Sequence, residues 1–237
     1  MAAKQVAISI CGTNNNKKIM FKRYEQNLVG KDYVVGDIHG CFTLLEKWLK
    51  HLGFNEATDR LFSVGDLVDR GAESHRALEF LAKPWFFAVR GNHDQMAIDY
   101  TKGQCNINLY KTNGGSWFIN LPLEEREKIA KEFGKLPVAM EVETSRGLVG
   151  IVHADCIYPT WDELRNMVNI PFVADQCMWM RDRQTNGDDR GVAGVWCVVV
   201  GHTPVLAPRK LGNVINIDTG ACFRGTLTVL EMTKLYY

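Results

Sequence analysis

The sequence lacks the features that would place it in a membrane or in a disulfide-bonded scaffold. Its longest apolar runs, such as residues 195–200, are about strand length, whereas a helix needs roughly 20 apolar residues to cross a bilayer. The seven cysteines are scattered, odd in number and free of any C-x-x-C pair, which argues against a disulfide framework or a structural zinc site. The first residues show no cleavage pattern of a signal peptide. We therefore expect a protein of the reducing cytoplasm with no membrane partner.

An excess of charge of one sign is also lacking. Lys and Arg number 28 against 27 Asp and Glu, so the chain does not have the strongly basic surface of a nucleic-acid binder. Only 7 of the 237 residues are proline and 46% are hydrophobic, which is the composition of an ordinary globular protein. The length fits one large domain. We expect a monomer without a regulatory subunit, whose partners are selected by a local site.

Three strand-like runs are each followed by a polar motif and a helical pattern. Residues 33–35 lead to GDIHG at 36–40, residues 61–64 to GDLVDRG at 65–71, and residues 85–89 to RGNHD at 90–94. Apolar residues recur at helical spacing over residues 44–52, and helical stretches are also predicted at 74–82 and after residue 94. Strands that alternate with helices predict a largely parallel sheet with its loops gathered at the carboxyl ends of the strands.

The second half of the chain predicts a second sheet. Residues 101–137 read as a loop around NGG at 113–115 followed by an amphipathic helix between Pro122 and Pro137, which we interpret as an inserted helical cap. Strands are predicted at 138–144, 148–152, 195–200, 214–217 and 226–230. The expected fold class is therefore α/β, with two mixed sheets packed face to face in a sandwich, helices outside and a small helical cap.

Six residues that can bind metals follow predicted strands. They are Asp37, His39, Asp66, Asn92, His153 and His202. Oxygen and imidazole ligands together suit Mn²⁺, Fe²⁺ or Zn²⁺ better than Ca²⁺ or Mg²⁺ alone. Six ligands are too many for one tetrahedral ion, whereas two ions about 3.5–4 Å apart that share a carboxylate would use them all. Each Gly-Asp or Gly-Asn pair alone is an ordinary turn sequence, so the set as a whole carries the prediction of a two-metal site.

The combination of these motifs resembles the phosphoprotein phosphatase family of metallophosphoesterases. Within that family it is most similar to the branch that contains the bacteriophage lambda protein phosphatase and its bacterial relatives. NGG at 113–115, WMR at 179–181 and IDTGA at 217–221 extend the resemblance from about residue 20 to the C-terminus. It implies the calcineurin-like metallophosphoesterase fold, with a single catalytic domain over residues 20–237. Residues 1–19 fall outside the resemblance and are expected to be a variable or disordered extension.

The resemblance also implies roles for the metal ligands. The first ion would be held by Asp37, His39 and Asp66, and the second by Asp66, Asn92, His153 and His202. Asp66 would then bridge two divalent ions, which activate a shared hydroxide for direct attack on a phosphate monoester. Mn²⁺ is the expected metal, with Fe²⁺, Zn²⁺, Ni²⁺ and Co²⁺ as alternatives.

The remaining site residues are assigned to the leaving group and the phosphate. His93 follows the ligand Asn92 without being needed as a ligand, so it is the expected general acid, and Asp69 would orient its ring. Arg70 and Arg90 would hold the phosphate oxygens with forked donors. Arg181 resembles a further phosphate-binding arginine of the family, and Asn92 is expected to contact the phosphate as well.

The sequence is compatible with three candidate functions. The first is a serine/threonine phosphatase, or one of dual specificity, that acts on phosphoproteins or phosphopeptides. The second is a symmetrical dinucleoside tetraphosphatase, but bacterial members of that group carry Ala where this chain has Asp69. The third is a scaffold without turnover, which should have lost the acid or the arginines, and this chain has both. The choice among phosphoserine, phosphothreonine and phosphotyrosine stays open.

Overall fold

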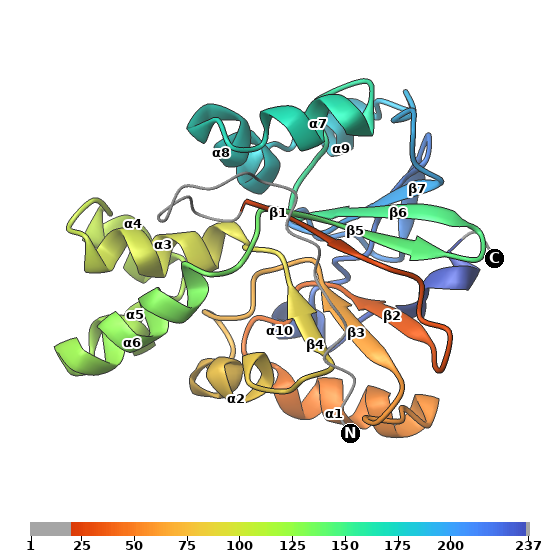
Figure 1. The fold of residues 1–237 in the computed structure, drawn as a ribbon. Coiled ribbons are helices and arrows are strands. Elements are labelled where there is room, and N and C mark those ends of the chain that lie inside the picture. Colours follow the sequence, from red (N-terminus) through yellow and green to blue (C-terminus); the bar gives the residue numbers. More distant parts are fainter. Residues whose placement is uncertain (1–19, 236–237) are drawn as a thin grey trace, which may run out of the picture.

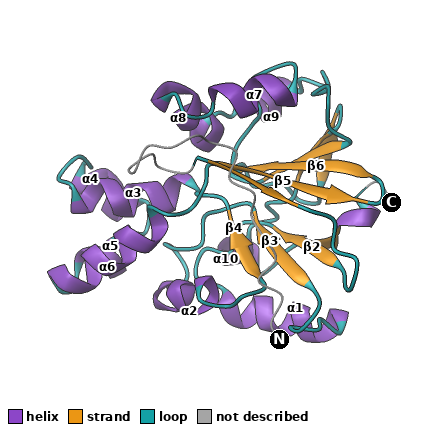
Figure 2. Ribbon diagram, in the orientation of Figure 1, coloured by secondary structure: helices purple, strands orange, loops and turns teal. Residues whose placement is uncertain are grey.

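The computed structural model describes residues 20–235, and the extension predicted over residues 1–19 lies outside the described part. Two mixed β-sheets face one another (Figure 1 and Figure 2). The first has the strand order β10 (Val229–Glu231), β2 (Asp32–Val35), β3 (Arg60–Ser63) and β4 (Phe86–Ala88). Strands β2, β3 and β4 are parallel, and β10 runs antiparallel to β2. The alternation of strands and helices in the first half therefore builds the predicted parallel sheet.

The second sheet has six strands. Their order is β1 (Phe21–Tyr24), β5 (Ala139–Thr144), β6 (Gly147–Val152), β7 (Cys197–Val200), β9 (Val214–Asn216) and β8 (Arg209–Leu211). Strand β6 is antiparallel to β5 and parallel to β7, so the second sheet is mixed too. The facing surfaces of the two sheets share a core in which Val34 and Phe62 of the first sheet meet Met140, Ile151 and Val199 of the second.

Helices cover both outer faces (Figure 1). On the first sheet they are α1 (Phe42–Leu52), the 3₁₀ turn Ser74–Arg76 and α2 (Ala77–Leu81); on the second they are α7 (Trp161–Met167), α8 (Pro171–Trp179) and α9 (Asp182–Asn186). Helix α1 buries Phe42 and Leu45 and ends at Gly53, whose left-handed φ of 64° stops it. The four-layer sandwich predicted from the sequence is confirmed.

The predicted cap consists of short helices at one side of the sandwich (Figure 1). Helix α3 (Asn92–Thr101) begins directly after β4 and packs on α6 (Leu123–Phe133). The segment predicted as a loop contains α4 (Ile107–Thr112) and α5 (Ser116–Ile119). Helix α4 begins because the Asn106 side chain accepts hydrogen bonds from two backbone N–H groups of its first turn. Helices of four and six residues are too short for apolar periodicity to show them.

The predicted sheet assignment was wrong at both ends of the chain. Strand β1 precedes the first strand expected, and it joins the second sheet by pairing with β5. The last strand, β10, was assigned to the second sheet but returns to the first and pairs with β2. Strand β8, the helix α10 (Ala221–Arg224) and the 3₁₀ turn Met232–Lys234 were also not predicted. The pairing partner of a short strand is set by contacts distant in sequence, which local patterns do not contain.

Within residues 20–235 there is no helix with the length and apolar character needed to cross a membrane. The six cysteines in this part of the chain are free thiols. Cys11 lies outside the described residues.

Candidate metal and phosphate site

The six predicted metal ligands lie at the carboxyl ends of the strands and are all buried. Asp37 and His39 follow β2, Asp66 follows β3, and Asn92 is the first residue of α3 after β4. From the second sheet, His153 follows β6 and His202 follows β7. The carboxyl ends of parallel strands in both sheets thus bring six polar side chains to one place, as the strand pattern predicted.

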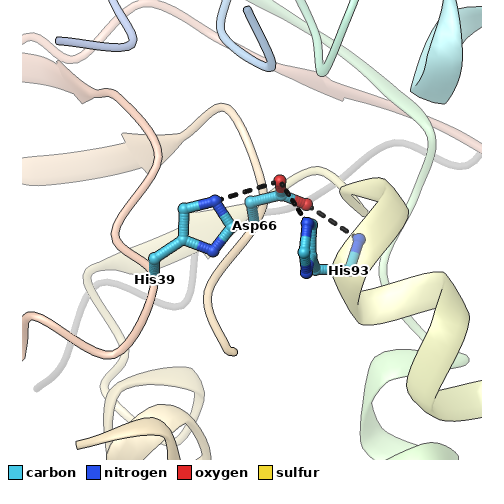
Figure 3. A group of neighbouring side chains, drawn as sticks. All are labelled: His39, Asp66 and His93. Atoms are coloured by element: carbon cyan, nitrogen blue, oxygen red, sulfur yellow. Dashed lines mark hydrogen bonds and ion pairs between the residues drawn. The ribbon is translucent and has the colours of Figure 1, made fainter. Parts of the chain in front are cut away.

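Asp66 is at the centre of the cluster. Its Oδ2 lies 3.4 Å from His39 Nε2 and 3.3 Å from His153 Nε2 (Figure 3 shows the side facing His39). Its Oδ1 accepts a hydrogen bond of 2.9 Å from the backbone N–H of His93, which fixes the orientation of the carboxylate. Two groups of side chains with metal-binding spacing share this residue, one with His39 and His93 and one with His153 and His202. Asp66 is therefore the residue that the two groups have in common.

The remaining predicted ligands contact one another around Asn92 and Asp37. Asn92 Oδ1 lies 2.9 Å from His153 Nε2 and 2.9 Å from His202 Nδ1. The Asp37 carboxylate accepts the backbone N–H of His202 at 3.1 Å. A Cβ atom at position 201 would come within 1.9 Å of Asp37 Oδ1, so Gly201 is required for this approach.

Each histidine ligand has one ring nitrogen held by a backbone carbonyl. The pairs are His39 Nδ1 with Val68 O, His153 Nδ1 with Val64 O, and His202 Nε2 with Trp179 O, at 2.8, 2.8 and 3.2 Å. A ring nitrogen that donates to a carbonyl must carry the hydrogen, so in the neutral imidazole the other nitrogen presents its electron pair. In all three rings that other nitrogen points into the cluster, which is the arrangement that a metal-binding histidine requires.

The charges of the cluster fit divalent cations. Burial, together with the charges of His93 and Arg70, lowers the pKa of His39 to about 3, and burial with His153 lowers the pKa of His202 to about 2. These two imidazoles are neutral at pH 7 and can act as ligands. Burial, and after it the repulsion of nearby carboxylates, raises the pKa of Asp37 well above its usual range. Divalent cations would relieve that repulsion.

We expect cation binding to release at least one proton per chain near pH 7. Burial disfavours a charge on His153, but Asp66 and Asp37 outweigh it and raise the pKa of His153 to about 9. The ring therefore carries a proton on both nitrogens below that pH, and a cation must displace one of them. Titration calorimetry with Mn²⁺ in buffers of different ionisation enthalpy measures the number released. A count of zero at pH 7 would contradict the expectation that a cation displaces a proton from His153.

Strained backbone marks the same region. Among residues 20–235, the non-glycine residues with φ in the left-handed region are His39, Asp66, Asp69, Arg70 and His202. Each such residue costs on the order of 1–3 kcal/mol and is typically found at functional sites. All five belong to the predicted site. The sequence could not reveal this strain, since none of them is a residue type that defines such a turn by itself.

The predicted pairing of His93 with Asp69 is present. His93 Nδ1 lies 2.7 Å from Asp69 Oδ2, and both side chains are buried. The other ring nitrogen, Nε2, lies 4.0 Å from Asp66 Oδ2, so it points toward the predicted metal ligands (Figure 3). Burial raises the pKa of the Asp69 carboxyl, while hydrogen bonds from His93 and Trp117 oppose that shift. The Asp69 carboxylate therefore sets the orientation of the His93 ring, and Nε2 of that ring points toward Asp66.

Arg70 and Arg181 lie beside the cluster. The exposed Arg70 has its Nη1 at 2.6 Å from His39 Nε2, and its guanidinium lies over the Phe223 ring at 5.1 Å from the centroid. Arg181 donates through Nη1 to the His202 carbonyl and to Thr203 Oγ1, both at 3.2 Å. Both guanidinium groups retain donors that an anion near the cluster can bind.

Arg90 does not have the predicted position. Its side chain is fully buried and donates to the carbonyls of Phe133, Gly134 and Leu136 and to Gln95 Oε1. The guanidinium therefore binds the end of α6 and the segment after it, and the prediction that Arg90 holds the phosphate is wrong in this structure. The RGNHD motif indicated a polar loop, but it did not indicate on which side of the loop the arginine lies.

We expect Arg90→Lys to lower stability and leave phosphate binding unchanged. Lysine cannot reproduce the forked set of donors, and each lost hydrogen bond from a charged group to a buried acceptor costs about 1.5–3 kcal/mol. Urea unfolding measures the loss of free energy, and competitive inhibition by inorganic phosphate measures binding. An inhibition constant that rises severalfold in the folded variant would restore Arg90 to the phosphate site.

The turn at residues 113–115 seats the cap on the loop that carries Asp69 and Arg70. Gly114 has a φ of 95°, and a Cβ there would lie 2.5 Å from the backbone nitrogen of Arg70. Two cap side chains also reach Asp69: Trp117 Nε1 donates to Asp69 Oδ1 at 2.7 Å, and Tyr110 Oη donates to it at 3.5 Å. Sequence reasoning missed Trp117 and Tyr110. Their only signal was their closeness to the NGG motif.

Gly114→Ala should reduce activity, whereas Gly103→Ala should not. Both glycines have a positive φ, so each alanine costs about 1 kcal/mol of stability for its backbone conformation. Position 103 has nothing within 4 Å of an added Cβ, whereas at position 114 the Cβ must displace Arg70. Steady-state kinetics of the two variants distinguish the effect of backbone strain, which both share, from the effect of displacing Arg70, which only Gly114→Ala has. Equal activity in both would show that the contact with Arg70 does not matter.

The buried carboxylates, the neutral imidazoles and the His93–Asp69 pair, placed at the carboxyl ends of strands, define a metal-dependent hydrolase. The profile of the Calcineurin-like phosphoesterase family matches residues 33–225. The chain belongs to this family of metallophosphoesterases, as the sequence motifs predicted.

Individual relatives agree with this placement. Serine/threonine-protein phosphatase 1 of Salmonella typhimurium is 38% identical over 216 residues, which are 90% of this chain and 97% of that protein. An asymmetrical bis(5'-nucleosyl)-tetraphosphatase of Geobacillus thermodenitrificans is 27% identical over 235 residues, covering 85% of this chain and 90% of that protein. A crystal structure of a cold-active protein-tyrosine phosphatase from a Shewanella species has a TM-score of 0.59 at 18% identity, over 91% of this chain and 78% of that one. This structural likeness concerns the fold alone.

Proposed function

We propose that the chain is a metal-dependent serine/threonine phosphoprotein phosphatase that hydrolyses phosphate monoesters. The observation that carries the proposal is the position of the Asp66 carboxylate, which belongs to two groups of potential metal ligands. His93 lies beside Asp66, and its ring is held by a hydrogen bond to Asp69. The identity of 38% to a protein named serine/threonine-protein phosphatase, against 27% to one named tetraphosphatase, supports the choice of a protein substrate.

The site would hold two divalent cations, with Mn²⁺ as the expected metal. Asp37, His39 and Asp66 would hold one, and Asp66, Asn92, His153 and His202 the other. When bound, two such ions neutralise phosphoryl oxygens and lower the pKa of a water molecule so that it can attack the phosphorus. The buried carboxylates and the neutral imidazoles of His39 and His202 support this assignment.

The protein side chains would complete the reaction. Arg70 and Arg181 would bind the phosphate oxygens with their free donors, and the Asn92 amide would contact the same group. A serine or threonine alkoxide is a poor leaving group, so a proton must reach its oxygen as the ester bond breaks. His93 would supply that proton from Nε2. The predictions of a monomer and of one catalytic domain over residues 20–237 stay predictions.

The test uses metal-stripped protein with Mn²⁺ added back. We expect restored hydrolysis of a phosphoserine peptide and of p-nitrophenyl phosphate, measured as released phosphate and nitrophenolate. Diadenosine tetraphosphate is the third substrate, because the tetraphosphatases are relatives as well. Cleavage of the dinucleotide alone would replace the proposal by a dinucleoside tetraphosphatase, symmetrical if two molecules of ADP form and asymmetrical if ATP and AMP form. Binding of two ions without cleavage of any substrate would favour a scaffold.

A further inference from the structure

Trp117 connects the helical cap to the pair formed by Asp69 and His93. It lies in α5, half-buried, and its indole Nε1–H donates to Asp69 Oδ1 at 2.7 Å. The other oxygen of the same carboxylate, Oδ2, lies 2.7 Å from His93 Nδ1. The side chains of Trp117, Asp69 and His93 therefore form a chain of hydrogen bonds that begins in the cap and ends beside the predicted metal ligands.

The indole hydrogen bond fixes the direction of the Asp69 carboxylate. This group can rotate about its Cβ–Cγ bond, and rotation about such a bond is only weakly restricted by the side chain itself. Apart from His93, the side chains donating to it within residues 20–235 are Trp117 and, at the longer distance of 3.5 Å, Tyr110. Because Asp69 is completely buried, water does not replace a lost donor easily. Removing the indole N–H thus leaves Oδ1 without its close partner.

We propose that Trp117 is a positioning residue for the departure of the leaving group, acting on His93 through Asp69. The inference rests on the proposed phosphatase function. In the step concerned, a water oxygen forms the new bond to phosphorus, the ester P–O bond breaks, and the proton on His93 Nε2 moves to the departing oxygen. One proton of the water stays on the phosphate and the other restores the proton of His93. A ring that is held less firmly transfers this proton less often, so the effect should grow with the need of the leaving group for a proton.

The variant Trp117→Phe tests this with two substrates. Phenylalanine keeps an aromatic ring in the cap but removes the N–H donor together with part of the indole ring. Loss of a partner that orients a functional side chain typically costs roughly 10–100-fold in activity, and we expect a fall of kcat in that range for a phosphoserine peptide. For p-nitrophenyl phosphate, whose leaving group departs without a proton, the fall should be much smaller. KM should change for neither substrate, because the hydrogen bond of Trp117 goes to Asp69 and not to a predicted phosphate ligand.

Trp161→Phe is the matched control. Trp161 also donates from Nε1 to a buried carboxylate, Glu141 Oε2 at 2.8 Å, but it lies in α7 against the second sheet. Its substitution removes the same type of hydrogen bond away from the site. We expect this variant to lose stability without changing the ratio of the two kcat values. The ratio therefore separates a positioning role from a general loss of packing.

A measurement without substrate accompanies the kinetics. In metal-free protein, ¹⁵N NMR of the histidine side chains should show His93 Nδ1 protonated and bound to Asp69 in the wild type. In Trp117→Phe this resonance should shift or broaden, and in Trp161→Phe it should not. An equal loss of kcat on both substrates, or an unchanged His93 resonance, would overturn the inference. A wild type inactive on the peptide would instead contradict the proposed function, and the NMR comparison would still decide the role of Trp117.

Discussion

Replacing Asp66 by asparagine should abolish the binding of two cations and with it most of the activity. Asp66 Oδ1 accepts the backbone N–H of His93, so the amide oxygen of an asparagine would stay on that side. The amide NH₂ would then take the place of Oδ2, between His39 and His153. A nitrogen that carries two hydrogens has no electron pair to offer a cation, and the variant also loses one negative charge. The loss should exceed the roughly 10–100-fold cost of removing a group that merely orients a ligand.

Titration calorimetry and electron paramagnetic resonance with Mn²⁺ measure the number of ions bound. The matched control is Asp32→Asn, which also removes the charge of a buried carboxylate. Asp32 pairs with Arg60 at the start of β2, whereas the cluster begins after the end of that strand. We expect this control to lose stability and to bind Mn²⁺ as the wild type does. Two ions bound with unchanged affinity by Asp66→Asn would show that this carboxylate is not shared.

The positions of the predicted metal ligands in the fold could be inferred because they depend on local sequence. A β-branched run followed by Gly-Asp or Gly-Asn fixes where a strand ends, and parallel strands end on the same side of a sheet. Asp37, Asp66 and Asn92 followed from this rule within the first sheet. His153 and His202 came from a second sheet, and only the packing of the two sheets brings them to Asn92.

The features that escaped the sequence depend on side-chain direction and on contacts between distant segments. Arg90 lies beside the ligand Asn92, yet its guanidinium turns into the protein, because the carbonyls at the end of α6 need donors. No pattern in the sequence indicated a role for Trp117, because only the docking of the cap brings its N–H to Asp69. Composition and periodicity describe which face of an element is apolar, but they do not specify the partners of single polar atoms.

His93→Asn should lower kcat for a phosphoserine peptide by roughly 10²–10⁴-fold, the range typical of a lost general acid. Asparagine has no nitrogen that can both bind Asp69 and carry a transferable proton toward the cluster. With p-nitrophenyl phosphate the loss should be far smaller, since that leaving group departs without a proton.

The metal content of the same variant distinguishes the two roles that the geometry allows His93. Its Nε2 belongs to a group of potential ligands with His39 and Asp66, although Asp69 holds the other ring nitrogen at 2.7 Å. If His93 is the acid, the variant binds as many Mn²⁺ ions as the wild type, and its defect depends on the leaving group. If His93 is a ligand, one ion is lost and both substrates are affected alike. The six predicted ligands would already account for two ions, and His93 is the ring that a carboxylate orients, so we expect the first result.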